Sequence, residues 1–369
     1  MGNICHKKVV SKVDEEMQKS NKEFKKLNEN SDLNINMSQF EIIKKLGSGS
    51  FGDVHMVKHK QSGQIYAMKV LLKEKIKKND LVENSKVERI ILSKLNFPFI
   101  VEFNYSFQSH SKLFIVTEYV SGGDLNELLK KKKVFSSYMS KLYLAEIVLS
   151  LEYLHSNNCI YRDLKPENIL LGKDGHIKII DFNLSKLFLS SNITDNRAES
   201  ICGTADYMAP EIIIQNEYDY LVDWYSLGIL AFVFHAGYTP FNCKKNPLDT
   251  SVKKQTIYFN EKLFSEEAKN LISELLKYDC KERLGKRGVD EIKDHEYFAE
   301  IDWDKVLKKE YKPDSLYIPN KALIEGEEKI LNSEDTKNKD NECSYTQDSY
   351  QTKGETYKGF TYMKDNPIP

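Results

Sequence analysis

Residues 161–168 read YRDLKPEN, and in this stretch an aspartate, a lysine and an asparagine lie within six residues. Asp163 can accept a proton from a hydroxyl group, which is the role of a general base. Two residues later, Lys165 can balance negative charge on a group that is being transferred. Either residue alone could be an ordinary surface side chain, so partners elsewhere in the chain decide whether the two act together.

A second informative stretch, residues 179–186, reads IIDFNLSK. Its Asp181 lies thirteen residues after Asn168, the last residue of YRDLKPEN. Mg²⁺ prefers one or two protein carboxylates together with phosphate oxygens and water, rather than a cage made of protein alone. Asp181 and the amide oxygen of Asn168 match this preference, and they predict a magnesium site that handles phosphates.

A glycine-rich stretch, LGSGSFGDV at residues 46–54, precedes both motifs. Gly47, Gly49 and Gly52 allow backbone N–H groups to approach an anion without side-chain clashes. The same spacing opens a dinucleotide site when a helix follows, but here alternating apolar residues predict a strand. The stretch therefore predicts a phosphate-binding hairpin.

Seventeen residues beyond Gly52, Lys69 lies in an apolar strand-like segment. A buried ammonium without a partner is unfavourable, so this lysine needs a carboxylate. Glu88 on the following predicted helix can supply it, and the pair would hold Lys69 where it neutralises two phosphates. The alternative is a lysine that snorkels at a strand edge.

These elements, in this order and spacing, match the signature of protein kinases: a glycine-rich loop, a strand lysine, a catalytic loop and a D-F-x segment. The sequence resembles the eukaryotic protein kinases from Phe40 to Phe298. YRDLKPEN, CGTADYMAPE, NFPFIV and AGYTPF make it similar to the AGC group, and in particular to the catalytic subunit of cAMP-dependent protein kinase. The Asp-Phe-Asn triplet and YIPNK also resemble the YANK-type kinases.

The resemblance implies an α+β bilobal protein kinase fold. It has a small antiparallel β-sheet lobe with one key helix and a larger, mainly helical lobe. Hydrophobic periodicity predicts strands at 40–48, 53–60, 64–71, 101–107 and 112–118, and the key helix at 80–95. The expected domains are an N-terminal segment at 1–39 with an amphipathic helix, a kinase domain at 40–298 with lobes at 40–120 and 121–298, and an AGC-type tail at 299–369.

By the same resemblance, the chain uses ATP and Mg²⁺. The catalytic residues implied are Asp163, Lys165, Lys69 and Glu88, and the metal ligands implied are Asn168 and Asp181. The residues implied at the nucleotide are Leu46, Gly47, Gly49, Ser50, Phe51, Gly52, Val54, Ala67, Lys69, Glu118, Val120, Asp124, Asn168, Leu170 and Asp181.

Two phosphorylation sites also follow from the resemblance. Ser200 precedes ICGT, where these kinases carry their activating phosphate, with Arg162 and Lys186 as the basic residues that would hold it. YKGFTY at residues 357–362 is similar to the AGC hydrophobic motif, which docks on the small lobe. Phosphorylation of Thr361 would add about −1.5 to −2 charges and strengthen that docking. Both sites imply an upstream activating kinase. For YKGFTY, the alternative is a disordered tail.

The expected substrates are proteins with serine or threonine acceptors. Asp124 and Glu167 occupy places where Arg-directed relatives grip basic side chains, so a basic residue upstream of the acceptor is expected. Val233 occupies a third such place and weakens the case for a double-arginine preference. Ala205, in GTAD where relatives have GTPE, helps to line the place for the following residue, which is expected to be apolar. The exchange of proline for alanine is expected to loosen that loop.

Asn183 stands where most kinases have the glycine of D-F-G. In the kinases that the chain resembles, no side chain at this place touches the phosphates, which implies a conformational role. Glycine is permissive at positive φ, and asparagine is among the few other residues that tolerate that region. Because Lys69, Asp163, Asn168 and Asp181 all remain, the exchange is expected to alter a switch and to leave catalysis intact.

Composition limits the other classes of protein. A net charge of −1 over 369 residues gives no reason to expect a nucleic-acid partner. The six cysteines are scattered and form no C-x-x-C pair, which fits a reducing cytosol and a cytoplasmic protein. No run of residues approaches the roughly 18 to 20 apolar residues of a membrane-spanning helix.

The chain begins MGNICHKK, which predicts peripheral membrane contact through acylation. Gly2 is the acceptor for myristate, although the Ser or Thr usual at position 6 is replaced by His6. One myristoyl chain binds membranes only marginally, so Cys5 as a palmitate acceptor, or the lysines that follow, would supply the second signal. An ordinary N-terminus is the alternative.

The sequence thus predicts a serine/threonine protein kinase that transfers the γ-phosphoryl group of ATP. Two other classes stay open. A nucleotide-binding pseudokinase scaffold would need Asp181 to fail as a metal ligand, and a membrane adaptor without enzymatic activity would leave the kinase motifs unexplained. Regulation is expected through phosphorylation, the membrane or a separate regulatory subunit.

Overall fold

The computed structural model describes residues 35–49, 52–79, 81–188, 198, 200, 202–241, 249–313, 357 and 360–364. The predictions for Gly2, Cys5, Ser50, Phe51 and the N-terminal amphipathic helix lie outside the described residues. Within these described ranges, no helix is long and apolar enough to cross a membrane.

The chain divides into two compact units. The first contains the described parts of Met1–Asn96, Val101–Tyr119 and Glu325–Pro369. The second contains Phe97–Ile100 and the described parts of Val120–Ile324.

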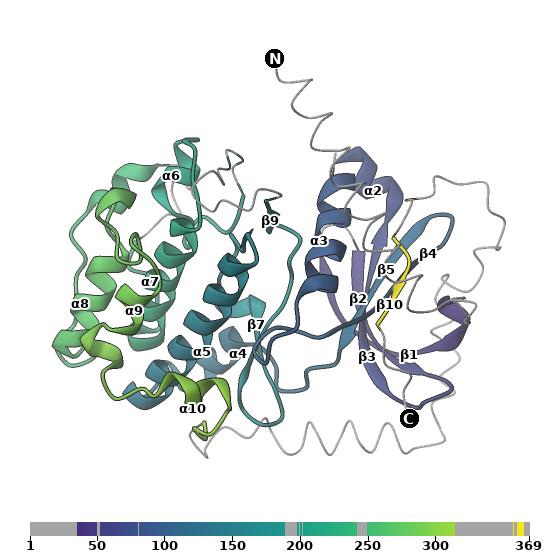
Figure 1. Ribbon diagram of the computed structural model, residues 1–369, viewed down its shortest axis with the longest axis horizontal. Helices are drawn as coiled ribbons and strands as arrows, with labels where there is room; N and C mark the ends of the chain where they lie inside the picture. Colours follow the sequence, from purple (N-terminus) through teal and green to yellow (C-terminus); the bar gives the residue numbers. More distant parts are fainter. Residues whose placement is uncertain are drawn as a thin grey trace. The chain divides into compact units, whose positions relative to one another are not determined.

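The first unit is built on a six-stranded sheet with the order β1-β2-β3-β5-β4-β10 (Figure 1), in which every neighbouring pair is antiparallel. Its strands are β1 (Phe40–Gly49), β2 (Gly52–His59), β3 (Ile65–Leu72), β4 (Phe103–Gln108), β5 (Lys112–Glu118) and β10 (Tyr362–Met363). Strands β1 to β5 confirm the small antiparallel sheet predicted from the alternation of apolar residues. Strand β10 was not predicted.

The β1–β2 hairpin shows why its second strand begins with glycine. Gly49 and Gly52 face one another as the last pair of the hairpin. A Cβ on Gly52 would lie 1.7 Å from the carbonyl oxygen of Val70 on β3, so no larger residue fits there without moving the strand. A Cβ on Gly47 would meet no atom within 4 Å. Packing therefore requires glycine at the start of β2 but not at residue 47.

An aromatic cluster around Phe40 forms the core of the first unit. The Phe40 ring stacks on Phe107 with 5.7 Å between centroids, and Phe107 stacks on Phe114 at 4.6 Å. Aromatic and β-branched side chains at alternate strand positions fill one face of a pleated sheet, which explains the period of two in the sequence. The other buried members are Ile35, Val57, Tyr66, Met68, Val70, Tyr105 and Val116.

Short helices complete the first unit. The 3-10 helix η1 (Met37–Gln39) leads into β1, and Asn36 caps it by accepting a hydrogen bond from the Ser38 N–H (3.0 Å). Helices α2 (Lys73–Lys78) and α3 (Val82–Lys94) follow β3. Helix α3 is the predicted key helix, whereas α2 was not predicted.

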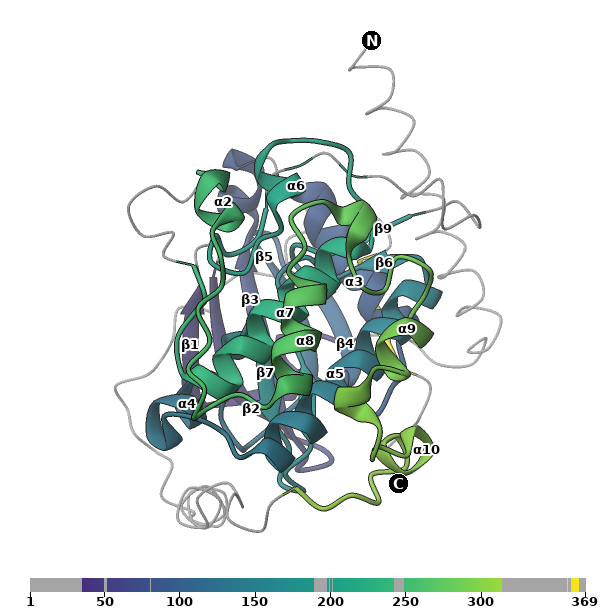
Figure 2. The same cartoon turned by 90° about the vertical axis from the view of Figure 1, so that its left-hand side faces the viewer.

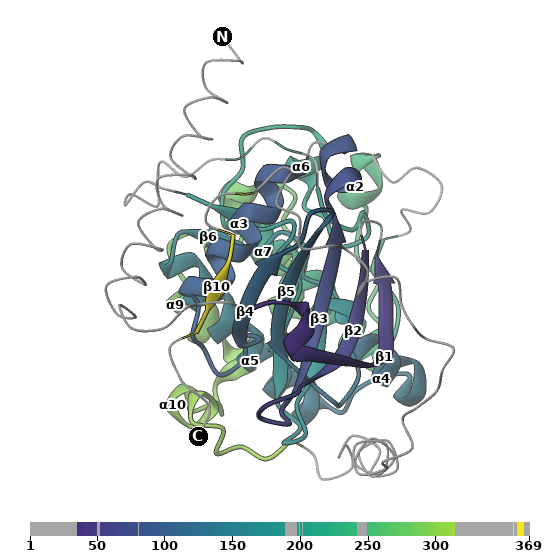
Figure 3. The same ribbon diagram turned by 90° about the vertical axis from the view of Figure 1, so that its right-hand side faces the viewer.

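The tail segment around Phe360 packs against the sheet, where β10 pairs with β4 (Figure 3). Phe360 is fully buried and Tyr357 is 6% exposed. Ser106 Oγ donates a hydrogen bond to the carbonyl oxygen of Phe360 (2.5 Å), and Gln108 Nε2 donates one to that of Tyr357 (2.9 Å). In the structure, the aromatic residues of YKGFTY therefore lie on the small sheet, and backbone pairing adds to their side-chain contacts.

The second unit is mainly helical and is organised around α5 (Ser137–Ser156) and α7 (Leu221–Ala236), which Figure 2 shows among the other helices. Every residue of α7 is buried, which explains its nearly unbroken apolar sequence. Helix α5 begins after Ser136, whose Oγ accepts a hydrogen bond from the Met139 N–H (3.2 Å). Helix α7 ends at Gly237, which has the left-handed φ of 79° common at helix ends.

Short elements surround these two helices. The helices are α4 (Leu125–Lys132), α6 (Pro210–Ile213), α8 (Glu266–Leu275), α9 (Asp290–Lys293) and α10 (Trp303–Leu307). The 3-10 helices are η2 (Pro166–Asn168), η4 (Thr250–Lys254), η5 (Cys280–Glu282) and η6 (Glu296–Phe298). The strands form two antiparallel pairs, β6 (Cys159–Ile160) with β9 (Lys186–Leu187) and β7 (Ile169–Leu171) with β8 (Ile177–Ile179).

The sequence predicted a division into lobes at 40–120 and 121–298. In the structure, residues 97–100 belong to the second unit. Phe97 stacks on Tyr153 of α5 with 4.6 Å between centroids. Ile100 forms a parallel bridge with Ile179 of β8. These contacts join partners far apart in the chain, so the local pattern of residues did not indicate them.

Phe360→Ala is expected to lower the free energy of unfolding by about 3 to 5 kcal/mol, the usual range for truncating a buried phenyl ring. Thr361→Ala is the matched control, because Thr361 is exposed, and it should change stability by less than about 0.5 kcal/mol. Urea unfolding followed by intrinsic fluorescence measures both. Equal stabilities for the two variants would contradict the docking of the tail.

Candidate active site

Strand β3 and helix α3 bring Lys69 and Glu88 together in the first unit. Lys69 Nζ lies 2.7 Å from Glu88 Oε1, which makes a charge-assisted hydrogen bond. The Glu88 side chain is 3% exposed, whereas that of Lys69 is 23% exposed. The carboxylate therefore fixes the ammonium, while part of the lysine side chain stays exposed.

The other predicted nucleotide residues of the first unit follow the strand register. Val54 on β2 lies opposite Lys69, and Ala67 on β3 lies opposite Thr117 on β5. Glu118 ends β5, where its N–H donates to the carbonyl oxygen of Glu102 (2.9 Å) and its Oε1 accepts from the Glu102 N–H (2.8 Å). The remaining predicted positions of this unit lie on β1 and β2: Leu46, Gly47, Gly49 and Gly52.

In the second unit, Asp223 of α7 holds the backbone of YRDLKPEN. Its fully buried carboxylate accepts hydrogen bonds from the N–H groups of Tyr161 (2.9 Å) and Arg162 (2.8 Å). His155 Nε2 lies 2.8 Å from the same carboxylate. Arg162 has a φ of 70°, which is uncommon for a residue other than glycine. Asp223 thus clamps a strained segment.

Asp163 has a dense set of hydrogen bonds. Lys165 Nζ lies 2.7 Å from Asp163 Oδ2, and Asn168 Nδ2 donates to the same oxygen (2.8 Å). Thr204 Oγ1 donates to Asp163 Oδ1 (3.0 Å) and accepts from Lys165 Nζ (2.8 Å). The carboxylate is therefore fixed through both oxygens by groups from the catalytic loop and from the GTAD segment. Such a group can act as an oriented general base.

The two predicted metal ligands, Asn168 and Asp181, lie in adjoining segments. The Ile180 N–H donates to the carbonyl oxygen of Asn168 (3.0 Å), and Asp181 is the next residue. Asn168 Nδ2 donates to the carbonyl oxygen and to Oδ2 of Asp163, so Oδ1 is the atom of this amide that can bind a cation. A carboxylate and an amide oxygen fit a Mg²⁺ ion whose other ligands are phosphate oxygens and water.

Tyr161 supports both segments. It is fully buried, and its hydroxyl donates a hydrogen bond to the carbonyl oxygen of Ile180. Burial, together with the charges of Asp163, Asp181 and Asp223, raises the pKa of Tyr161 well above its ordinary value. The hydroxyl therefore remains protonated, and it remains a donor, at neutral pH.

Asn183 lies in a turn that its neighbours close. The Ser185 N–H donates to the carbonyl oxygen of Phe182 (3.1 Å), and Arg162 Nε donates to that of Leu184 (2.6 Å). Asn183 is not among the described non-glycine residues with positive φ, so this conformation does not use the backbone freedom that the sequence suggested. Its Oδ1 is buried and has no hydrogen-bond partner within the described residues. The turn accepts asparagine without backbone strain.

Arg162 also reaches Ser200, the predicted activating phosphorylation site. Arg162 Nη1 donates to Ser200 Oγ (2.9 Å) and to the Tyr218 hydroxyl (2.9 Å). That hydroxyl donates in turn to the carbonyl oxygen of Ser200 (2.7 Å). A phosphate on Ser200 would therefore form directly beside a guanidinium. Lys186, the other predicted basic residue, lies on β9 with its ammonium 5.9 Å from the Phe188 ring centroid.

Among the predicted substrate and nucleotide residues of the second unit, Asp124 bridges Leu170 and caps α4 by accepting from the Glu127 N–H (2.8 Å). Val120 begins the longer of the two segments that make up the unit. Glu167 is exposed on η2, where a substrate can reach it. Val233 lies within α7 and is only 5% exposed, and its effect on substrate preference stays a prediction.

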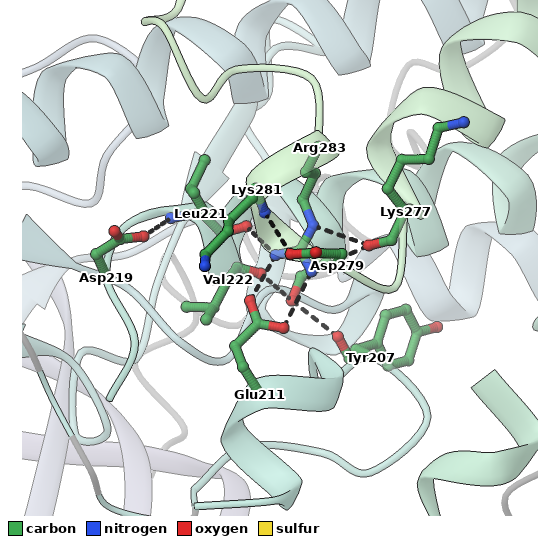
Figure 4. Close-up of polar contacts among 10 residues, drawn as sticks. Tyr207, Glu211, Asp219, Leu221, Val222, Lys277, Asp279, Lys281 and Arg283 are labelled. Atoms are coloured by element: carbon green, nitrogen blue, oxygen red, sulfur yellow. Dashed lines mark hydrogen bonds and ion pairs between the residues drawn. The ribbon is translucent and has the colours of Figure 1, made fainter. Parts of the chain in front are cut away.

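Glu211 and Arg283 form a buried bidentate pair (Figure 4). Arg283 Nη1 donates to Glu211 Oε1 (2.5 Å), and Nη2 donates to Oε2 (3.0 Å). Nη1 also donates to the carbonyl oxygen of Leu221 (2.9 Å), and Nη2 to that of Lys277 (3.2 Å). The pair ties α6 to the start of α7 and to the segment after α8.

Thr204 and Tyr218 were not predicted as members of the site. Thr204 meets Asp163 across 41 residues, and Tyr218 meets Arg162 across 56 residues. A hydroxyl residue carries no sign of such a distant partner in its type or spacing. The GTAD motif marked the segment that contains Thr204 but did not mark the role of its hydroxyl.

Comparison with known proteins agrees with this geometry. Residues 40–298 match the family model described as the protein kinase domain. The chain belongs to the protein kinase family. It is 44% identical over 280 residues to ribosomal protein S6 kinase alpha-6 of Homo sapiens, which covers 75% of this chain and 37% of that protein.

Two further kinases are similar over most of the chain. Identity is 42% over 275 residues with cAMP-dependent protein kinase type 3 of Saccharomyces cerevisiae, which covers 73% of this chain and 67% of that one. Identity is 36% over 347 residues with serine/threonine protein kinase ypkA of Aspergillus fumigatus, which covers 91% and 52%. The chain spans less than two fifths of the S6 kinase alpha relatives that it matches.

These relatives are serine/threonine kinases of the AGC group, so the predicted membership of the kinase family and of this group is confirmed. Protein kinases in general use ATP and Mg²⁺. The likeness to the YANK-type kinases stays a prediction.

Arg283→Met is expected to lower the free energy of unfolding by about 3 to 5 kcal/mol, because it leaves the carboxylate of Glu211 buried without its partner. Glu211→Gln should also destabilise, and the double variant should lose about 0.5 to 3 kcal/mol less than the sum of the two. Chemical denaturation measures all three. Lys281→Met is the control, because Lys281 is exposed on η5. Strictly additive losses would contradict the pairing.

Proposed function

We propose that this protein is an active serine/threonine protein kinase that transfers the γ-phosphoryl group of ATP to serine or threonine hydroxyls of protein substrates. The observation that carries the proposal is the Asp163 carboxylate, which Lys165, Asn168 and Thr204 hold at the same time. Membership of the kinase family supplies the class of reaction, and the serine/threonine kinases among the relatives support the class of acceptor.

Asp163 is assigned as the group that orients the acceptor hydroxyl and takes its proton. The new O–P bond forms as the bond from the γ-phosphorus to the β,γ-bridging oxygen breaks and ADP leaves. The hydrogen bonds from Lys165, Asn168 and Thr204 prevent the carboxylate from turning away from that hydroxyl. In phosphoryl transfer, a protein contributes mostly by aligning the reactants and stabilising charge. Lys165, whose ammonium lies 2.7 Å from Asp163, then balances charge on the group in transit.

The phosphates of ATP are assigned to groups from several elements. A Mg²⁺ ion, when bound, neutralises charge on the phosphate oxygens. Asn168 Oδ1 and the Asp181 carboxylate are its proposed protein ligands. Lys69, held by Glu88 at 2.7 Å, binds two of the phosphates through its ammonium. The backbone N–H groups of the β1–β2 hairpin are assigned to the same phosphates.

The proposed substrates carry a basic residue upstream of the acceptor and an apolar residue after it. Glu167 on η2 supports the first preference, because it is exposed and lies four residues after Asp163 in the catalytic loop. The segment around Ala205 supports the second, because it is tied to Asp163 through Thr204.

Phosphorylation is proposed as the means of activation. A phosphate on Ser200 would gain charge-assisted hydrogen bonds from Arg162, whose Nη1 is already 2.9 Å from Ser200 Oγ. Thr361 is exposed on the docked tail, where an upstream kinase can reach it. Acylation at Gly2 and Cys5 would add a reversible contact with the cytoplasmic face of a membrane.

The test is Mg²⁺-dependent transfer from labelled ATP to a serine peptide with an upstream arginine. Asp163→Asn is expected to lower the single-turnover rate about 10² to 10⁴-fold, the usual contribution of a general base, while ATP binding is kept. Wild-type transfer no faster than that of Asp163→Asn, with ATP still bound, would contradict the proposal and favour a pseudokinase scaffold.

Asn183→Gly is the matched comparison in the same assay. It is expected to keep the wild-type rate to within about threefold, because a residue without positive φ does not require glycine. A drop as large as that of Asp163→Asn would show that the asparagine side chain takes part in catalysis.

A further inference from the structure

Two adjacent lysines on η4, Lys253 and Lys254, have opposite environments in the second unit. Lys254 is exposed, with its ammonium 4.7 Å from the ring centroid of Tyr278. Lys253 is only 2% exposed, and a lysine is seldom buried to this extent unless its charge is compensated. Because the surroundings of the two residues differ so sharply, the burial of Lys253 needs an explanation.

The ammonium of Lys253 contacts a backbone carbonyl group and two aromatic rings. Lys253 Nζ donates a hydrogen bond to the carbonyl oxygen of Ala205 (3.2 Å). The same nitrogen lies 5.5 Å from the ring centroid of Tyr225 on α7 and 5.8 Å from that of Phe241. Both distances are within the range in which an aromatic ring attracts a cation. Two buried aromatic rings thus hold the charge in place beside Ala205.

Ala205 belongs to the segment at residues 202–208, which is anchored on both sides of it. On one side, Thr204 Oγ1 donates to Asp163 Oδ1 (3.0 Å). On the other side, Ser226 Oγ of α7 donates to the carbonyl oxygen of Tyr207 (2.8 Å). The ammonium of Lys253 holds the carbonyl between these two anchors. A proline at residue 205 would restrict its own φ angle. Alanine does not restrict it, so contacts from outside the segment have to hold the backbone in place.

The Tyr225 ring that contacts Lys253 also contacts the buried ion pair of this unit. The guanidinium of Arg283 lies 5.0 Å from the centroid of the same Tyr225 ring. Arg283 is in turn bonded to Glu211. A displacement of Lys253 is therefore resisted by packed residues of α7 and by the bidentate pair.

We propose that Lys253 is a positioning residue for the acceptor peptide. By fixing the Ala205 carbonyl, its ammonium sets the shape of the 202–208 segment, which receives the residue that follows the phosphorylated serine or threonine. The inference rests on the proposed kinase function, because it requires a peptide acceptor on this segment. Lys253 itself touches no reacting atom, and it acts through Ala205 and Thr204.

The experiment compares wild type, Lys253→Met, Lys253→Arg and Lys254→Met. Two serine peptides are used, identical except for leucine or glutamine directly after the serine. Loss of a hydrogen bond from a charged donor predicts that Lys253→Met lowers the leucine-over-glutamine ratio of kcat/KM about tenfold. The loss should appear mainly in the KM for the leucine peptide, with the KM for ATP unchanged. Lys253→Arg should restore most of the ratio, and Lys254→Met should match wild type.

A purely structural role would give a different result. Lys253→Met would then lower kcat for both peptides equally, because a smaller fraction of the enzyme would be active. The leucine-over-glutamine ratio of kcat/KM would stay at the wild-type value, and this result would overturn the inference. If Lys253→Met does not fold, Lys253→Gln and Lys253→Arg are compared by the same ratio, and equal ratios would overturn it too. Failure of wild type to phosphorylate either peptide would instead overturn the proposed kinase function, together with the inference that depends on it.

Discussion

The carboxylate of Asp163 is the point at which the catalytic loop and the peptide segment hold each other. Lys165 and Asn168 bind one of its oxygens from within the loop, and Thr204 binds the other from the GTAD segment. Lys253 holds that segment at the carbonyl oxygen of Ala205, and Ser226 of α7 holds it at that of Tyr207. The position of the base therefore depends on contacts from several parts of the second unit that are distant in sequence. A change in any of these contacts would shift the base relative to the reacting hydroxyl.

Backbone strain lies next to this network. Arg162 and Asp181 have φ angles of 70° and 58°, in the left-handed region that most residues avoid. Such conformations persist only where the surroundings over-determine them. Asp223 supplies that constraint for the catalytic loop through two backbone N–H groups, and the hydroxyl of Tyr161 supplies it at Ile180, directly before Asp181. The buried pair of Glu211 and Arg283 holds the start of α7, from which Asp223 extends.

Local pattern predicted the elements whose burial follows a regular period, and it did not predict pairings between distant segments. Burial alternates along β3, and α7 is buried on all sides, so the sequence showed both patterns. The docking of Phe360 on Ser106 joins residues 254 positions apart, and no periodicity indicates the strand pairing beside it.

In the site, the spacing of carboxylate and amide residues in the motifs predicted the catalytic base and the metal ligands. Thr204 and Lys253 did not, because a hydroxyl or an ammonium takes its role from its partner. For Asn183, residue type suggested a positive φ that the folded turn does not adopt.

Thr204→Val keeps the shape of the side chain and removes its hydroxyl. Its single-turnover rate of transfer to a serine peptide tests whether the peptide segment and the base position each other. Loss of the bonds to Asp163 and Lys165 should lower the rate about 10- to 100-fold through misplacement of the base, with the KM for ATP unchanged. A rate equal to that of wild type would contradict the claim that the peptide segment and the base position each other.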